Sequence, residues 1–167
     1  QFESEGPKVI PCWINGHAYL SVTDSFFDVL NPATGEAIRR VPLCGASESA
    51  QAVIAAQAAQ AEWAEMGLPA RRICLGNLAD ALDRYTGHFA KLLSEECGFD
   101  EARATAEVGE AVAALHGAMV GQTGVFGLVL DASRPLASFA EIMAPAVMAG
   151  ATLVVKPSPK APSAVFA

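Results

Sequence analysis

The sequence is poor in charged and aromatic residues, and it contains no long apolar run. Of its 167 residues, 17% are charged and 7% are aromatic. No stretch of about 18 uncharged apolar residues occurs, so we expect no segment that spans a membrane. Lysine and arginine (11) are outnumbered by aspartate and glutamate (18), which gives a net charge of −7. Because an acidic chain is repelled by nucleic acid and by anionic membranes, we expect neither as a partner.

Cysteine is scarce as well, and its spacing matches no common metal site or disulfide framework. The four cysteines are Cys12, Cys44, Cys74 and Cys97. None of them forms a Cys-x-x-Cys pair, and none has a histidine at the spacing of a zinc site. We therefore expect no bound metal and no disulfide framework, and this usage suits a protein of the reducing cytoplasm.

The sequence does have enough apolar residues, 52%, for a packed core, and its pattern changes from strands to helices. Residues 1–11 are predicted to be a loose leader, and residues 12–167 a single domain. A β segment is expected at 12–46, where Asn15-Gly16 predicts a β-hairpin with a type I′ turn. A helical cluster is expected at 47–120, with helices at about 48–66, 70–85, 88–97 and 101–119.

Capping residues and apolar periodicity give further expectations for these helices. Ser47 is predicted to be the N-cap of the first helix and Asp100 the N-cap of the fourth. The first helix is expected to bury an apolar stripe that includes Val53 and Ile54. The second helix is expected to place its larger apolar residues near one face, namely Ile73, Leu75, Leu78 and Leu82.

The last part of the chain, residues 124–167, has the pattern of a βαβ unit. Two apolar strands, Val125–Leu130 and Thr152–Val155, are separated by a helix at Leu136–Ala149, an arrangement that predicts a parallel pair. The predicted fold class is therefore α/β: a β-hairpin segment, a helical cluster and an incomplete, Rossmann-like parallel βαβ unit. The chain stops as another helix begins and has no initiator Met, which predicts a fragment or a processed module.

A series of motifs, in this order, resembles the N-terminal part of the aldehyde dehydrogenase superfamily. They are Ile14-Asn15-Gly16, Phe27-Asp28-Val29-Leu30-Asn31-Pro32-Ala33-Thr34-Gly35-Glu36, Trp63, Ala70-Arg71-Arg72, Glu96-Cys97-Gly98, Gly124-Val125-Phe126-Gly127, Ala144-Pro145-Ala146, Ala149-Gly150 and Val154-Val155-Lys156-Pro157. The resemblance covers nearly all of residues 13–162 but only the first part of a full-length family member. It implies an aldehyde-dehydrogenase-type fold in an oxidoreductase that converts aldehydes to acids with NAD or NADP.

The resemblance also places residues where the family binds its cofactor. These positions are Leu130, Asp131, Lys156, Ser158 and Pro159. Lys156 corresponds to the lysine whose ammonium group binds the adenosine ribose, a role that suits the carboxyl end of a strand; the alternative is a solvated loop lysine. Pro159 stands where a glutamate usually binds the same ribose, and its side chain accepts no hydrogen bond. We therefore expect NAD or NADP to bind weakly or not at all.

The loop after the first apolar strand departs from the family pattern. Asp131-Ala132-Ser133-Arg134-Pro135 replaces Pro-Trp-Asn-Phe-Pro, so Ser133 stands at the position of the oxyanion-binding asparagine. Loss of one oxyanion donor typically lowers the rate ~10²–10³-fold, and Ser133 has the alternative role of a turn or N-cap residue. The family's nucleophilic cysteine and general base would lie downstream of this chain, and Cys74 and Cys97 are expected to be packing residues. No residue is therefore assigned a catalytic role.

Three functions remain open from the sequence. The first is a non-catalytic aldehyde-dehydrogenase-like domain with a structural or assembly role in a larger enzyme. It is favoured by the short connection between Gly117 and Gly124, where the family usually carries its subunit-bridging arm. The second is the N-terminal fragment of an active NAD(P)-dependent enzyme whose catalytic cysteine lies outside this chain, and the third is a free-standing nucleotide-binding module.

The parallel strands carry almost no charge that would protect an open sheet edge. Parallel sheets are normally buried on both faces. We therefore expect the edge to be covered by a second copy, by the chain's own N-terminal β segment, or by a catalytic aldehyde dehydrogenase domain.

Overall fold

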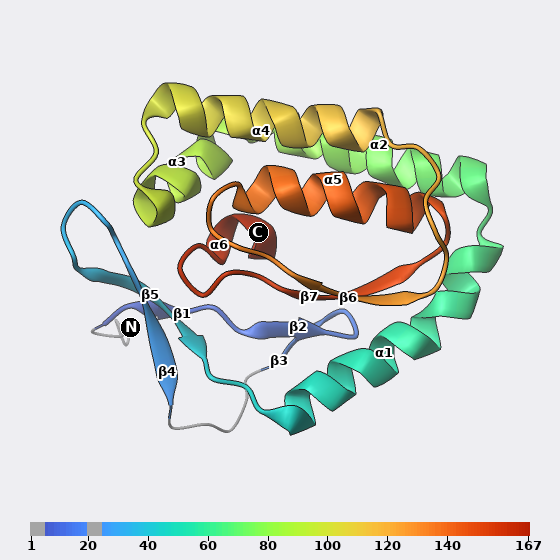
Figure 1. Cartoon of the computed structure of the whole chain (residues 1–167), viewed down its shortest axis with the longest axis horizontal. Helices are drawn as coiled ribbons and strands as arrows, with labels where there is room; N and C mark the ends of the chain where they lie inside the picture. Colours follow the sequence, from blue (N-terminus) through green and yellow to red (C-terminus); the bar gives the residue numbers. More distant parts are fainter. Residues whose placement is uncertain (1–5, 20–24) are drawn as a thin grey trace, which may run out of the picture.

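The computed structural model describes residues 6–19 and 25–167, which form a β segment, a helical cluster and a βαβ unit (Figure 1). Of the predicted leader, residues 1–5 lie outside the described part. Lys8–Val9, however, forms strand β1, which pairs in parallel with β5 (Ala37–Pro42). The prediction of a loose leader is therefore wrong for these two residues, because the edge of β5 offers backbone groups with which they can pair.

The β segment contains two small sheets. In the first, β4 (Phe26–Leu30) pairs antiparallel with β5, which lies between β1 and β4. The second is the hairpin of β2 (Cys12–Ile14) and β3 (His17–Tyr19). The predicted Asn-Gly turn is confirmed, since Asn15 and Gly16 both have positive φ angles, 52° and 75°.

The helical cluster follows the predicted order. Its members are α1 (Ala46–Glu65), α2 (Leu68–Arg84), α3 (Thr86–Cys97) and α4 (Glu101–His116). Asp100 caps α4 as predicted, because its carboxylate accepts from the backbone N–H of Arg103 at 2.8 Å. The N-cap of α1 is Gly45 and not Ser47; the Glu48 side chain accepts from the Gly45 N–H at 2.9 Å, which fixes the helix start two residues earlier.

The buried faces of the first two helices agree with the prediction only in part. On α2, Leu75 and Leu82 are buried as predicted, whereas Ile73 and Leu78 are exposed. On α1, Val53 and Ile54 are exposed, and the helix instead buries Ala56. The small Ala56 lets the helix backbone approach β7 (Thr152–Lys156), whose Thr152 hydroxyl donates to the Ala56 carbonyl at 2.7 Å. Periodicity therefore predicted a helix correctly but assigned its buried side to the larger side chains.

The βαβ unit is confirmed. Strand β6 (Val125–Val129) pairs in parallel with β7, and α5 (Pro135–Met148) connects them, with Pro145 inside the helix. Helix α5 lies between this pair and α2 and α4, whereas α1 lies on the opposite side (Figure 1). The described strands of the β segment form separate sheets and do not pair with β6 or β7, so backbone pairing with this segment does not cover the β6–β7 edge.

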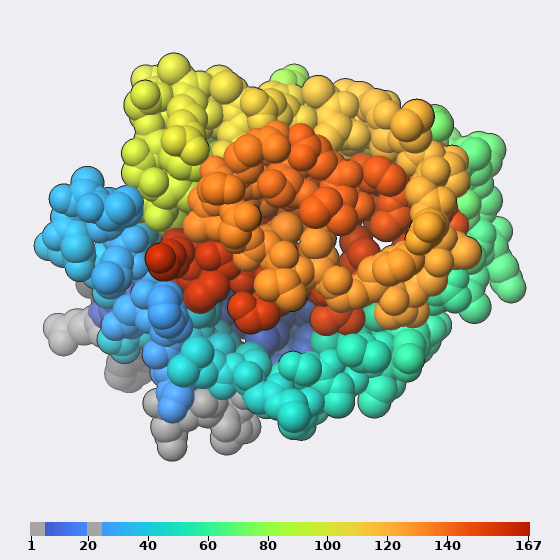
Figure 2. Space-filling view, viewed as in Figure 1, coloured from blue at the N-terminus to red at the C-terminus, as the bar shows by residue number. Residues whose placement is uncertain are grey.

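The core lies mainly between α2, α3, α4 and α5. Its largest fully buried side chains include Leu93 of α3, Val108 of α4 and Met148 of α5. Many of its other members are alanines, whose small side chains allow close helix packing. The final helical turn, α6 (Ser163–Phe166), and the C-terminus lie at the surface shown in Figure 2. No helix in the described part of the chain has the length and apolarity that a membrane crossing requires.

Candidate functional site

The loop between β6 and α5 contains the residue predicted to replace an oxyanion donor. The Asp131 carboxylate accepts two hydrogen bonds from Ser133, one from its backbone N–H and one from its hydroxyl, each at 2.6 Å. These bonds lower the pKa of Asp131 below its usual value. Side-chain bonds of this kind stabilise tight turns. Ser133 is therefore a turn residue, and its hydroxyl proton is directed at a carboxylate; the N-cap of α5 is Arg134.

The N-terminus of α5 is occupied by an acidic side chain from the helical cluster. Glu107 of α4 accepts from the backbone N–H groups of Leu136, at 3.0 Å, and Ala137, at 3.5 Å. Burial raises the pKa of Glu107, while these two backbone bonds act in the opposite direction. In Rossmann-like units a helix N-terminus of this kind binds the cofactor's pyrophosphate. Here its donors are used within the protein.

Arg134, at the start of the same helix, is also committed to acidic partners. Its Nη2 atom lies 2.7 Å from a carboxylate oxygen of Glu110 and 2.7 Å from one of Glu141. These hydrogen bonds raise the pKa of Arg134 above its usual value. The positive charge of Arg134 is therefore balanced by two carboxylates, which weakens its attraction for an anion near the loop.

The remaining predicted cofactor positions lie at the ends of β6 and β7. Leu130 and Lys156 are neighbours, since the Leu130 N–H donates to the Lys156 carbonyl at 3.0 Å. The Leu130 side chain is buried, whereas Lys156 is exposed. Ser158 is buried, and its hydroxyl accepts from the Lys160 N–H at 3.3 Å. Pro159 has no polar side chain.

Most polar groups at and near these positions are engaged within the protein. Lys156 supplies a free ammonium group at the carboxyl end of a strand. The hydroxyl of Ser158 accepts a hydrogen bond within its own loop. Pro159 occupies the position where the family usually has a ribose-binding glutamate. The nearest helix N-terminus is capped by Glu107. Of the predicted cofactor positions, which all lie in the described part of the chain, Lys156 alone presents a polar side chain that is not engaged in its own loop.

The helical cluster is connected to the βαβ unit by three buried charged side chains that were not among the predicted site residues. They are Arg71, Glu96 and Glu107. Glu96 binds the start of α6, accepting from the Ser163 N–H at 3.0 Å and from the Ser163 hydroxyl. Glu107 lies beside Val108 on the buried face of α4. An acidic residue on an apolar helix face is the sequence feature that could have indicated its buried role.

Arg71 binds the carboxyl ends of two helices. Its Nε atom donates to the Met148 carbonyl of α5 at 3.1 Å, and its Nη1 atom donates to the carbonyls of Trp63 (3.2 Å) and Ala64 (2.7 Å) of α1. Helix C-termini carry partial negative charge and unpaired carbonyls, so a guanidinium group is a suitable partner. Arg71 thereby holds α1 and α5 at a fixed position around the β6–β7 pair.

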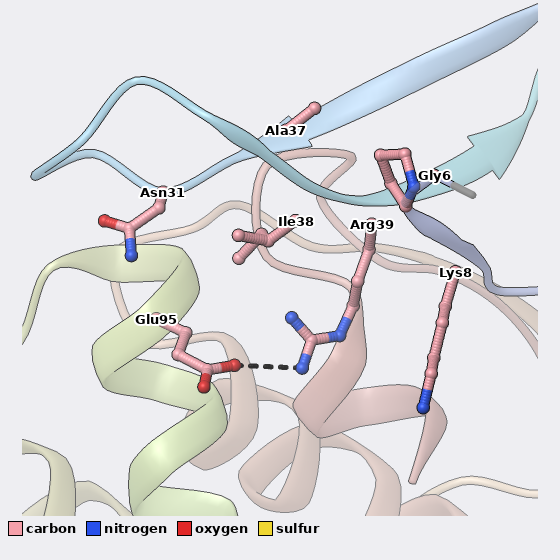
Figure 3. Close-up of a pocket in the computed structure, with 8 residues that line it drawn as sticks. Gly6, Lys8, Asn31, Ala37, Ile38, Arg39 and Glu95 are labelled. Atoms are coloured by element: carbon pink, nitrogen blue, oxygen red, sulfur yellow. Dashed lines mark hydrogen bonds and ion pairs between the residues drawn. The ribbon is translucent and has the colours of Figure 1, made fainter. Parts of the chain in front are cut away.

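A hollow of about 590 Å³ lies between the β segment and α3 (Figure 3). Lys8 and Arg39 extend into it from paired positions on β1 and β5. The Arg39 guanidinium donates to Glu95 at 2.9 Å and lies 3.7 Å from Glu96. None of the predicted cofactor residues lines it, and its arginine is already paired, so we assign it a structural role.

Cys74 and Cys97, both predicted to be packing residues, differ in their exposure. Cys97 is partly buried against the core, and burial raises the pKa of its thiol to about 12. Because the thiolate is the reactive form, Cys97 is not suited to act as a nucleophile. Cys74 is exposed on α2, so the packing expectation is wrong for this residue. Among the described residues, no cluster of histidine, cysteine and acidic side chains could hold a metal ion.

Known proteins with similar sequences and structures identify the relatives of this chain. A 3,6-anhydro-alpha-L-galactose dehydrogenase from Streptomyces coelicolor is 31% identical over 190 aligned positions, which cover 99% of this chain and 39% of the relative. The aligned stretch is longer than this chain of 167 residues, so the relative carries insertions that the chain lacks. The chain thus spans about two-fifths of the length of this relative.

Solved structures show the same fold. Lactaldehyde dehydrogenase from Escherichia coli superposes with a TM-score of 0.90 at 26% identity, covering 96% of this chain and 39% of that one. Aldehyde dehydrogenase C from Pseudomonas syringae, solved with NAD+ and octanal, gives a TM-score of 0.85 at 26% identity and covers 92% and 36%. The model of the aldehyde dehydrogenase family matches residues 19–123. With this match, the chain belongs to the aldehyde dehydrogenase family of oxidoreductases.

Proposed function

We propose that this chain is a non-catalytic aldehyde-dehydrogenase-family unit with a structural or assembly role in a larger enzyme. That enzyme would oxidise aldehydes to acids with NAD or NADP. The observation that carries the proposal is the pair of 2.6 Å hydrogen bonds from Ser133 to the Asp131 carboxylate. Because the Ser133 N–H and hydroxyl both donate to Asp131, neither is available to bind a substrate oxygen.

Oxyanion stabilisation needs free donors that are aimed at the position where negative charge develops. At this loop the Ser133 hydroxyl and N–H are both used, and the exposed Asp131 carboxylate would repel an oxyanion. The reaction also needs a thiolate, and the raised pKa of Cys97 keeps that thiol protonated at neutral pH. Neither the Ser133 donors nor the Cys97 thiol is therefore in the state that aldehyde oxidation requires.

The proposed cofactor behaviour follows from the same region. Lys156 would contact the ribose hydroxyls of NAD or NADP from the end of β7, but Pro159 offers no second contact. The N-terminus of α5 is closed to a phosphate by Glu107. We therefore propose weak binding or none, and a complete cofactor site would have to come from other parts of the enzyme.

The partners that we propose are a second copy of this chain or a catalytic aldehyde dehydrogenase domain. Support comes from the β6–β7 pair, which has no further strand in the described part of the chain. Val129 on β6 is 73% exposed, although it is an apolar residue of the central sheet. A surface of this kind is normally covered.

A second candidate is the N-terminal part of an active NAD(P)-dependent aldehyde dehydrogenase. It is favoured by the match to the Streptomyces coelicolor relative along 99% of this chain. In that case the catalytic cysteine lies elsewhere in the protein, and the loop at Asp131–Ser133 takes part in its site. The two candidates differ in whether this loop lies beside the reacting aldehyde.

The test uses the 167-residue chain and the complete reading frame that contains it. NADH formation is measured with aliphatic and aromatic aldehydes. A non-catalytic unit predicts no turnover by the chain alone and, in the complete protein, a kcat within about twofold of wild type for Ser133→Ala. Lys160→Ala is the control for a neutral change in a nearby loop.

Two results would count against this proposal. Turnover by the 167-residue chain that one Cys→Ser substitution abolishes would show that the chain holds its own nucleophile. In the complete protein, a fall in kcat of about 10²-fold or more for Ser133→Ala, without such a fall for Lys160→Ala, would show that the loop takes part in catalysis. That result would favour the second candidate.

A further inference from the structure

Two cysteines that are distant in the sequence meet in the β segment. Cys12 is the first residue of β2, and Cys44 lies in the connection between β5 and α1, 32 positions later. Their Sγ atoms are 3.1 Å apart. A disulfide bond measures about 2.05 Å, so the two sulfur atoms need to approach by about 1 Å to form one.

We propose that Cys12 and Cys44 form a reversible disulfide that fastens the β2–β3 hairpin to the start of α1. No other pair of cysteines in the described part of the chain has its sulfur atoms in contact. The pairing therefore selects one of the six possible connections among the four cysteines.

The fold gives this bond a structural purpose. The hairpin pairs only with itself among the described strands, and an isolated two-stranded hairpin is marginally stable in water. Trp13 contributes an edge contact to the Phe166 ring of α6, at 6.4 Å between centroids, but Trp13 itself is 64% exposed. A covalent connection between the hairpin and the helical cluster would restrict the hairpin far more strongly.

The connection at the other end is well anchored. Cys44 is followed directly by Gly45, the N-cap of α1, whose N–H is bound by Glu48. Cys44 therefore holds a fixed position at the start of a long helix. A bond from Cys12 to this point would close a loop that contains β2 to β5, and closing a loop of this length reduces the entropy of the unfolded chain.

The exposure of the two thiols indicates the order of reaction. Cys44 is exposed, whereas Cys12 is partly buried, and burial together with its hydrogen bond to Cys44 raises the pKa of Cys12 to about 12. Cys44 is therefore the thiol that an oxidant in solution reaches first. Cys12 is the resolving thiol, placed next to it.

We take a small disulfide, glutathione disulfide, as the oxidant that accepts the two electrons. The Cys44 thiolate attacks one sulfur of glutathione disulfide, forms a mixed disulfide and releases one glutathione thiolate. In the mixed disulfide, Cys44 no longer raises the pKa of Cys12 through its hydrogen bond and its charge, so Cys12 loses its proton to solvent more readily. The Cys12 sulfur then attacks Sγ of Cys44 and releases the second glutathione. Two cysteine thiols are oxidised, one glutathione disulfide is reduced to two glutathione molecules, and reduced glutathione reverses the sequence.

The experiment equilibrates the chain in glutathione buffers of increasing oxidised fraction. After the remaining thiols are blocked, the intact mass and disulfide-mapped peptides are measured. We expect the loss of two hydrogen atoms and a single peptide linkage between Cys12 and Cys44. Cys44→Ser and Cys12→Ser should each abolish the linkage, whereas Cys74→Ser, which removes an exposed thiol from α2, should leave it unchanged.

The melting temperature provides a second readout on the same samples. Oxidation of the wild type should raise it by about 5 °C or more, and dithiothreitol should reverse the rise. Oxidation of Cys44→Ser, an exposed and conservative change, should produce no rise.

Two results would overturn the proposal. The first is glutathione retained on Cys44 as a mixed disulfide with no internal linkage, which would show that Cys12 does not resolve it. The second is an internal linkage that leaves the melting temperature of the wild type unchanged, which would show that the bond does not fasten the hairpin.

Discussion

The carboxylate of Glu107 on α4 accepts a hydrogen bond from the backbone N–H of Leu136 at 3.0 Å and so caps the N-terminus of α5. The other end of α5 is bound by Arg71 through the Met148 carbonyl. Both ends of the helix in the βαβ unit are therefore held by buried charged side chains of the helical cluster. The helical cluster and the βαβ unit, which the sequence pattern predicts as separate segments, are thus joined by buried polar contacts.

Removing the Glu107 carboxylate should destabilise the protein. In Glu107→Ala the N–H groups of Leu136 and Ala137 lose their acceptor, and we expect the free energy of unfolding to fall by about 2 kcal/mol. Glu107→Gln keeps an acceptor oxygen and should lose less than half of that amount. Urea unfolding followed by circular dichroism measures both. Glu110→Gln, which changes an exposed ion pair on the same helix, should alter stability by less than about 1 kcal/mol.

Glu107 should also make stability depend on pH. Burial raises its pKa in the folded state above the ordinary value of 4.5, so the folded state binds the proton more tightly than the unfolded state. Its contribution to stability is then present below pH 4.5 and is lost as pH rises through the folded pKa. The unfolding free energy of the wild type minus that of Glu107→Gln should therefore decrease as pH rises from about 4.5 to 7. A difference that increases over this range would reverse the sign assigned to the pKa.

Arg71 should be more important for stability than its neighbour in the sequence. Arg71→Ala leaves three helix carbonyls without their donor and opens space beside Gly150, so we expect a loss of about 3 kcal/mol. Arg71→Lys should recover only part of it, because an ammonium group cannot reproduce the planar geometry of three donors. Arg72→Ala, an exposed control, should change stability by less than about 0.5 kcal/mol. Equal losses in Arg71→Ala and Arg72→Ala would contradict this role.

The proposed weakness of the cofactor site is open to a binding measurement. A ligand that binds only the folded state at 100 times its Kd stabilises it by about 2.7 kcal/mol. We expect no clear rise in the melting temperature of this chain at millimolar NAD or NADP. A rise of several degrees that is lost in Lys156→Ala and kept in Lys160→Ala would show instead that Lys156 belongs to a working site.

The uncovered β6–β7 pair should promote association. We expect the chain to form dimers or larger species in sedimentation velocity experiments at micromolar concentration. Val129→Lys places a charge on β6 and should shift the distribution toward the monomer. Ile73→Lys, at a position that is 64% exposed on α2, is the matched control. A wild type that sediments as a monomer and binds no hydrophobic dye would show that the strands need no partner.

The sequence predicted those features that depend on neighbouring residues. Asn15-Gly16 specifies its own turn, Asp100 caps the helix that follows it, and the two apolar strands predict a parallel pair. The inward face of α1 was not predictable in this way, because Ala56 is buried by its approach to Thr152, 96 positions later. Apolar periodicity indicates which residues share one face of a helix, but it does not indicate which element packs against that face.

The same limit applies to the candidate site. The loss of the oxyanion asparagine at Ser133 is visible in the sequence, because it is a local departure from a motif. That the Ser133 hydroxyl donates to Asp131, and that Glu107 closes the N-terminus of α5, depend on three-dimensional contacts. The proximity of Cys12 and Cys44 is of this second kind, since it requires the β segment to fold back to the start of α1.

The two acidic caps have a consequence for how the chain is made. A ribosome releases α3 and α4 before α5 and α6, so Glu96 and Glu107 leave the exit tunnel ahead of the backbone N–H groups that they bind. Until those groups arrive, both carboxylates must stay hydrated, which keeps water on the inner face of the nascent helices. The helical cluster can therefore complete its dry interior only after residue 163 has been synthesised, so its folding has to wait for α5 and α6 to emerge from the ribosome.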